Sequence, residues 1–314
     1  MKLATFEAGG APRIGSVHPE RNEVVDLAAA AAQTGRPGPF GDMLALIDAG
    51  PDGLAAAAAL DADPPAAAVL ALDTVRLLAP IPLPRRLRDC LVFEEHLLNS
   101  AKLLEEKTGK GFDIPEVWYR QPIYYKGNPY SVIGTGQDVI WPAYSQVMDY
   151  ELELACIVGR GGADIPVEQA RAHIFGLTVF NDCSARDAQA DEMLGTLGPA
   201  KGKDFDTGNV LGPWIVTLDE IGEIGSLKMT ARVNGEVRGG GSAGAMHHGF
   251  EQIIAYLSKS ERLVPGEVIG SGTVGTGCGL EVGRYPQSGD VVELEIDRIG
   301  TLRNRFLMPE RKNG

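Results

Sequence analysis

The sequence predicts a mixed, β-rich α+β fold with peripheral helices and a small N-terminal domain. Outside a few helical segments, the chain after residue 84 alternates apolar and polar residues and is interrupted by glycine and proline, as in strands joined by turns. Asn234-Gly235 separates two such alternating runs and is a strong signal for a two-residue hairpin. A proline-rich stretch at residues 79–84 forms a semi-rigid joint between the two parts.

The N-terminal part mixes short strand-like pieces with helical stretches at residues 42–48 and 53–60. The proline-rich joint divides the chain into a small domain at residues 1–80 and a larger one at residues 85–314.

Helical periodicity in the larger part is confined to three segments, residues 94–107, 167–172 and 250–258. The glycine-rich residues 239–244 are expected to form a flexible loop.

Composition excludes several classes of protein. With 314 residues and a net charge of −13, the chain lacks the clustered lysine and arginine of a general nucleic-acid binder. The first residues contain no apolar signal core, and no apolar run is long enough to cross a bilayer, so we expect a cytoplasmic protein without a membrane partner. Its four cysteines are far apart in sequence and predict neither a zinc site nor a disulfide framework.

Two glutamates in one apolar run are the first sign of a functional site. Glu151 and Glu153 lie two residues apart in a predicted strand, so both carboxylates project from the same face. Such a pair requires either a proton or a cation between the two groups. Asp182 ends the next apolar run and supplies a third carboxylate, and an all-oxygen set favours Mg²⁺, Mn²⁺ or Ca²⁺. The alternative is an exposed edge strand with solvated glutamates.

Other motifs are less informative. Gly270-Ser-Gly272-Thr-Val-Gly275 matches the dinucleotide-binding pattern, but further glycine follows it in place of a helix. The chain contains no phosphate-binding P-loop, no nucleophile elbow and no paired zinc histidines. His96 differs from the other histidines because Asp89 precedes it by seven residues and Asn99 follows one helical turn later.

Taken in chain order, these motifs resemble the fumarylacetoacetate hydrolase family from about Asp89 to Asn304. The resemblance is carried by Asp89-x6-His96-x2-Asn99, Asp149-Tyr-Glu151-Leu-Glu153, Asn181-Asp182-Cys-Ser-Ala-Arg186-Asp187, Gly202-Lys203-x-Phe205 and Gly272-Thr273. It implies that residues 85–314 form a catalytic domain with the C-terminal β-fold typical of that family. It also implies a tendency to form homodimers.

The resemblance also implies a role for each matching residue. Metal ligands are implied at Asp89, Glu151, Glu153 and Asp182, with Mg²⁺ as the expected ion and Mn²⁺ or Ca²⁺ as alternatives. The catalytic residues are His96 as the base that activates water, Glu281 as its orienting partner, and Lys203. Substrate-facing positions are Tyr125, Gln189 and Thr273, to which Arg186 is added as a cation able to bind a substrate carboxylate.

Some positions depart from the fumarylacetoacetase pattern. Leu91 and Met193 stand where that enzyme has substrate-facing tyrosines, and Glu105 stands where it has a substrate-binding arginine. These departures point to a relative that acts on a different dicarbonyl compound.

The function expected from these residues is metal-dependent hydrolysis of a carbon–carbon bond in a 1,3-diketone or an acylpyruvate-type 2,4-dioxo acid, in the catabolism of aromatic or sugar-acid compounds. Decarboxylation, isomerisation or hydration of a 2-oxo acid is the alternative, because all pass through a stabilised enolate. A second alternative is a non-catalytic scaffold in which the ion only joins strands.

Overall fold

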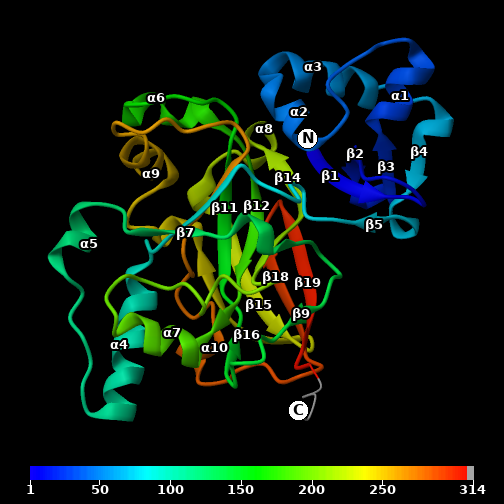
Figure 1. The fold of residues 1–314 in the computed structure, drawn as a ribbon. Helices are drawn as coiled ribbons and strands as arrows, with labels where there is room; N and C mark the ends of the chain where they lie inside the picture. The colour runs from blue at the N-terminus through cyan, green and yellow to red at the C-terminus, as the bar shows by residue number, and fades with distance from the viewer. Residues whose placement is uncertain (310–314) are drawn as a thin grey trace.

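The computed structural model describes residues 1–309 as a mixed α+β molecule dominated by a twelve-stranded sheet (Figure 1). The neighbours in this sheet follow the order β4-β3-β2-β1-β14-β12-β11-β17-β6-β7, with β5 beside β1 and β8 beside β14. The strands are β1 (Lys2–Glu7), β2 (Arg13–His18), β3 (Glu23–Asp26), β4 (Val69–Ala71), β5 (Arg76–Leu77), β6 (Arg86–Cys90), β7 (Tyr124–Gly127), β8 (Val132–Ile133), β11 (Leu152–Val158), β12 (Ile174–Asp182), β14 (Asn209–Thr217) and β17 (Glu267–Gly270).

Two smaller sheets complete the strand layers. The five-stranded sheet has the order β16-β15-β18-β19-β9, and β10 pairs with β13. Their strands are β9 (Val139–Ile140), β10 (Met148–Asp149), β13 (Ser184–Ala185), β15 (Lys228–Val233), β16 (Glu236–Ser242), β18 (Val291–Ile296) and β19 (Gly300–Leu307). The predicted hairpin is confirmed: Asn234 and Gly235 join β15 to β16 with φ angles of 53° and 79°, as this type of turn requires.

The helices lie around these sheets. They are α1 (Leu27–Thr34), α2 (Met43–Asp48), α3 (Gly50–Asp61), α4 (Glu94–Thr108), α5 (Glu116–Arg120), α6 (Val167–Ala170), α7 (Arg186–Met193), α8 (Leu218–Ile221), α9 (Phe250–Leu257) and α10 (Gly279–Val282). Helices α1 to α3 gather beside β1 to β4, whereas α4, α7 and α10 lie together at the lower end of the view in Figure 1. Among the described residues, no helix is both long enough and apolar enough to cross a membrane.

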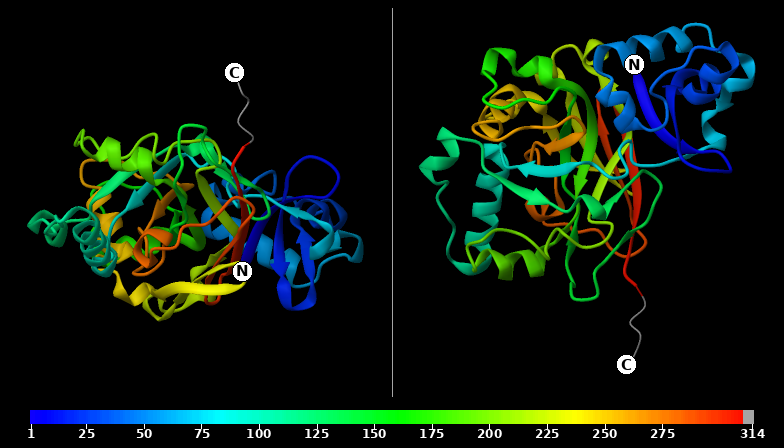
Figure 2. Two further views of the ribbon diagram at one scale, coloured as in Figure 1. Left: turned by 90° about the horizontal axis from the view of Figure 1, so that it is seen from below. Right: turned by 45° about the horizontal axis from the view of Figure 1, so that its top comes forward.

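The N-terminal residues remain together at one side of the molecule in both views of Figure 2. Their sheet is nevertheless continuous with the rest, because β1 pairs with β14 from Lys2 opposite Val216. The division into domains at residues 1–80 and 85–314 therefore stays a prediction about folding units, and residues 310–314 of the second lie outside the described part of the chain.

One expectation for a loop is wrong. Residues 239–242 belong to β16 and pair with β15, where we expected a flexible loop. Glycine is required there by close approach of the backbone: a Cβ on Gly239 would lie 2.0 Å from the carbonyl oxygen of Thr276.

The core lies on both faces of β11. Leu154 and Cys156 point to one side of the sheet, and Ala155 and Ile157 point to the other. The second face also buries apolar residues of the N-terminal helices, including Leu27 and Leu46. Glu153 shares the parity of Ala155 and is fully buried, so the edge-strand alternative for this glutamate is excluded.

Candidate functional site

Three buried carboxylates meet at one end of the large sheet. Asp89 lies near the end of β6, Asp182 ends β12, and Glu153 lies at the start of the antiparallel β11. One oxygen from each lies within 4.8 Å of the others, and we call these residues the acidic triad. The triad forms because β17 runs between β6 and β11 and brings their ends together.

Two glycines of the rejected dinucleotide pattern shape this group. A Cβ on Gly270 would lie 2.2 Å from Asp89 Oδ1 and 2.9 Å from Glu153 Oε2, so only glycine leaves room for both carboxylates. The N–H of Gly272, held at a φ of +82°, donates to Asp89 Oδ1 (3.2 Å) and Glu153 Oε2 (3.1 Å). The sequence signal was therefore present, as glycines at the end of a strand and just after it, but these glycines accommodate carboxylates and not a dinucleotide.

The triad has the electrostatics of a cation site. Burial raises the pKa of Glu153 well above its ordinary value, and the neighbouring charge of Asp89 raises it further. Burial likewise raises the pKa of Asp89, with the charge of Asp182 adding to it. Glu153 Oε1 and Asp182 Oδ1 are buried and find no hydrogen-bond donor among the described residues. An all-oxygen set with unmet negative charge fits a hard divalent cation such as Mg²⁺, Mn²⁺ or Ca²⁺.

Glu151, predicted as a fourth ligand, lies in a cationic setting. Lys203 Nζ contacts Glu151 Oε2 at 2.7 Å, and an Arg186 guanidinium nitrogen contacts Glu151 Oε1 at 2.7 Å. Burial alone would raise the pKa of Glu151, but Lys203 and Arg186 hold it far below the ordinary range. Its part in metal binding stays a prediction.

Lys203 connects Glu151 to the triad. Its Nζ also donates to Asp182 Oδ2 at 2.6 Å and to the Ser184 hydroxyl at 2.8 Å. Burial alone would lower the pKa of Lys203, but Asp182 and Glu151 raise it above the ordinary lysine value. Lys203 is therefore a fixed ammonium group that contacts both Glu151 and Asp182, the latter being a member of the triad.

The residues predicted to face substrate occupy three different settings. The Tyr125 hydroxyl donates to Asp182 Oδ2 at 2.8 Å, which brings it to the triad. Arg186 donates to Asp149 and to Gln189 Oε1 (3.0 Å) in addition to Glu151, so its nitrogens hold neighbouring side chains. Thr273 is buried in the loop that follows β17. Asp187 accepts from Ser145 and the backbone N–H of Gln146 and is not the partner of Arg186.

His96 and Glu281 form a second group, the histidine–glutamate pair. His96 lies in the first turn of α4 and Glu281 in α10, with His96 Nδ1 2.9 Å from Glu281 Oε2. The other carboxylate oxygen accepts from the N–H of Thr276 (2.9 Å) and from Asn99 (3.0 Å). Burial alone would raise the pKa of Glu281, but His96 and these donors hold it below its ordinary value.

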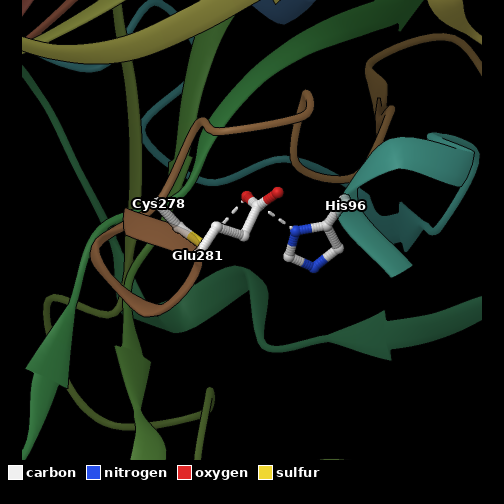
Figure 3. A group of neighbouring side chains, drawn as sticks. All are labelled: His96, Cys278 and Glu281. Atoms are coloured by element: carbon white, nitrogen blue, oxygen red, sulfur yellow. Dashed lines mark hydrogen bonds and ion pairs between the residues drawn. The ribbon is translucent and has the colours of Figure 1, made fainter. Parts of the chain in front are cut away.

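Cys278 is a neighbour of this pair that the sequence did not suggest. Figure 3 shows the Glu281 carboxylate between the imidazole of His96 and the thiol of Cys278, which donates to Oε2 at 3.2 Å. His96 also contributes to the low pKa of Glu151, after Lys203 and Arg186, which relates the pair electrostatically to the cluster around the triad.

The close packing at Gly270 gives a testable expectation. Gly270→Ala should weaken Mg²⁺ binding and cost about 1–3 kcal/mol of folding stability, because the added methyl group displaces Asp89 and Glu153. Gly41→Ala is the control, since nothing lies within 4 Å of a Cβ there. Calorimetric Mg²⁺ titration and urea unfolding of both variants measure the effect, and equal behaviour would contradict the tight carboxylate packing.

Cation binding should also depend on pH in a defined direction. The folded triad has raised pKa values, so it holds protons that the unfolded chain releases, and folding stability falls as pH rises through this range. A cation relieves this repulsion, so saturating Mg²⁺ should raise the Tm by about 5 °C, and more so near pH 8 than near pH 5.5. Thermal unfolding with NaCl of equal ionic strength as the control tests this, and a larger effect at the lower pH would contradict it.

Comparison with known proteins agrees with this geometry. A family model described as the fumarylacetoacetate (FAA) hydrolase C-terminal domain matches residues 94–307. Oxaloacetate tautomerase YisK of Bacillus subtilis is 36% identical over 241 residues, which cover 75% of this chain and 74% of that protein. Mitochondrial oxaloacetate tautomerase FAHD2A of Homo sapiens is 36% identical over 196 residues, or 60% of each chain, so the match spans about three fifths of that relative.

A solved structure extends the likeness to nearly the whole chain. Fumarylacetoacetate hydrolase from Exiguobacterium antarcticum is 29% identical, with a TM-score of 0.76 over 98% of this chain and 100% of that one. The sequence-based resemblance and the expected fold class are thereby confirmed. The matched region contains the histidine–glutamate pair and two members of the triad, and the chain belongs to the fumarylacetoacetate hydrolase family of enzymes.

Proposed function

We propose that this protein interconverts the keto and enol forms of a short 2-oxo dicarboxylic acid, with oxaloacetate as the substrate. The observation that carries the proposal is the buried acidic triad, whose all-oxygen donor set suits a cation that binds a 2-oxo acid. The two relatives named oxaloacetate tautomerase, each 36% identical, support this choice of substrate. It replaces hydrolysis as the leading activity.

Asp89, Glu153 and Asp182 would hold the cation, with Glu151 as the predicted fourth ligand and Mg²⁺ as the proposed ion. When bound, the cation would supply positive charge to the two adjacent oxygens of a 2-oxo acid and so stabilise the enolate.

The proton transfer is assigned to His96. Its Nδ1 faces Glu281, which leaves Nε2 to remove a proton from C3 of the keto acid. The C2 oxygen gains a proton from solvent to give the enol, and His96 then releases its extra proton to solvent. Glu281 fixes the orientation of the ring and stabilises the imidazolium that forms. Because the pKa of Glu281 is held low, it remains negative while His96 carries the proton.

Recognition of the substrate carboxylates is assigned to cationic and donor groups around the triad. Lys203 is proposed to stabilise developing oxyanion charge by its positive charge and not by a direct hydrogen bond, because it stays protonated while its N–H groups donate to Glu151, Asp182 and Ser184. Tyr125, Gln189 and Thr273 are proposed to contact substrate. The three carboxylate and amide partners of Arg186 favour a positioning role for it over direct substrate binding.

Hydrolysis of a carbon–carbon bond in a 2,4-dioxo acid is the second candidate. The histidine–glutamate pair favours it, since a histidine oriented by a carboxylate can equally take a proton from water. The solved fumarylacetoacetate hydrolase, 29% identical to this chain, supports the same reading.

One preparation with Mg²⁺ can separate these functions. We expect acceleration of the loss of enol absorbance when enol-oxaloacetate is the substrate, and faster deuterium exchange at C3 observed by NMR. Cleavage of acetylpyruvate without either effect would favour the hydrolase. Inactivity in both assays at saturating Mg²⁺ would favour the scaffold alternative.

A further inference from the structure

We propose that His96, Cys278 and Glu281 form a second metal site, which selects Zn²⁺ and chemically similar soft divalent ions and inhibits the enzyme when it is filled. The inhibitory part rests on the role proposed above for His96. The binding part rests on geometry alone: one nitrogen, one sulfur and one oxygen lie within 4.8 Å of one another at the contact between α4 and α10.

The distances suit a tetrahedral ion after a small expansion. Usual zinc bond lengths place nitrogen and oxygen ligands roughly 3.4 Å apart and oxygen and sulfur ligands roughly 3.6 Å apart. The observed separations are 2.9 Å from His96 Nδ1 to Glu281 Oε2 and 3.2 Å from Cys278 Sγ to the same oxygen. Each separation must therefore widen by about half an ångström, which side-chain rotation can provide.

The surrounding contacts leave the required oxygen available. Glu281 Oε1 is occupied by the N–H of Thr276 and the amide of Asn99, so these contacts keep the carboxylate in place. Oε2 faces His96 and Cys278. A metal ion at Oε2 would therefore replace only the contacts among the three ligands themselves.

Charge and donor type distinguish this site from the acidic triad. A thiolate, a carboxylate and a neutral imidazole carry two negative charges and neutralise a divalent ion in a buried setting. The triad offers only carboxylate oxygens, which suit Mg²⁺, whereas sulfur and nitrogen donors favour Zn²⁺, Co²⁺ and Cd²⁺. Two neighbouring sites can therefore hold different ions at the same time.

Proton balance explains how occupation would inhibit. The Cys278 thiol loses one proton to solvent as the metal–sulfur bond forms; burial otherwise keeps its pKa high and the thiol neutral. A metal on His96 Nδ1 leaves the ring proton on Nε2. That nitrogen then has no free electron pair, so it cannot remove the substrate proton.

Titration with Co²⁺ tests the site directly. The protein is first saturated with Mg²⁺ in excess, and Co²⁺ is then added while the near-ultraviolet thiolate-to-cobalt charge-transfer band is recorded. We expect one equivalent to produce the band, with its loss in Cys278→Ala and its retention in Cys156→Ala, which removes another fully buried thiol. If Cys278→Ala does not fold, Cys278→Ser and His96→Asn give the same test.

Inhibition is measured separately, relative to the uninhibited rate of each variant. The Zn²⁺ concentration for half-inhibition should rise by at least about 10-fold in Cys278→Ala. No band in the wild-type protein, or a band that Cys278→Ala leaves unchanged, would overturn the site. A band accompanied by equal Zn²⁺ inhibition in both proteins would overturn its inhibitory role. The cobalt band measures binding without enzyme turnover. Failure of the proposed tautomerase activity can therefore be distinguished from failure of the metal site.

Discussion

Asp182→Asn should lower divalent-cation affinity by at least about 10²-fold and reduce kcat/KM in parallel at subsaturating metal. The amide keeps the size of the side chain but removes the charge from Oδ1, which has no donor within residues 1–309. It also weakens the contact with Lys203 at Oδ2. Calorimetric titration with Mn²⁺ and Mg²⁺, together with kinetics over a range of metal concentrations, measures both effects.

Asp187→Asn is the matched control for this prediction. Both changes remove one carboxylate charge from the same short segment, but Asp187 accepts from Ser145 and Gln146 and is not part of the triad. Cation affinity should therefore remain within about threefold of the wild-type value. Wild-type affinity in Asp182→Asn as well would remove the triad from metal binding, whatever its effect on the Tm.

The elements that sequence reasoning predicted are those with local causes. The helix expected at residues 94–107 is α4, and the one expected at residues 250–258 is α9, because apolar spacing over two or more turns determines which face is buried. The second half of β16, residues 239–242, was expected to be a loop because its glycines look like a loop locally. Their reason is non-local, namely the backbone of Thr276 lying against Gly239.

The same distinction applies to the site. Glu151 directly precedes β11 and Glu153 lies in it, and the two-residue spacing predicted that both carboxylates share one face. Which charged groups meet each glutamate depends on side chains distant in sequence: the cations Lys203 and Arg186 at Glu151. At Glu153 the neighbour is another carboxylate, that of Asp89. Residue types and chemistry were therefore predictable, whereas the different settings of the two glutamates required the fold.

Cys278 belongs to a set of possible metal ligands, with His96 and Glu281, that a search for sequence motifs does not find. No zinc motif contains His96 and Cys278, which are far apart in the chain, and cysteines this isolated in sequence do not by themselves indicate a metal site. Contact between α4 and α10 brings the thiol to the carboxylate that orients the histidine. The function of such a thiol can be judged only from its neighbours.

His96→Asn should lower kcat by about 10²–10⁴-fold and leave Mg²⁺ affinity nearly unchanged, because it removes the proposed base without removing a carboxylate from the triad. Glu281→Gln should show a smaller loss, since the ring keeps a polar neighbour of similar size but loses the charge that stabilises imidazolium. Deuterium exchange at C3 of oxaloacetate measures the proton transfer itself.

The control is His173→Asn. His173 is a buried histidine whose Nδ1 contacts the carbonyl oxygen of Arg160, and the kcat of this variant should stay near the wild-type value. Wild-type exchange in His96→Asn would return this histidine to a structural role, and the base would then have to be sought among the groups around Lys203.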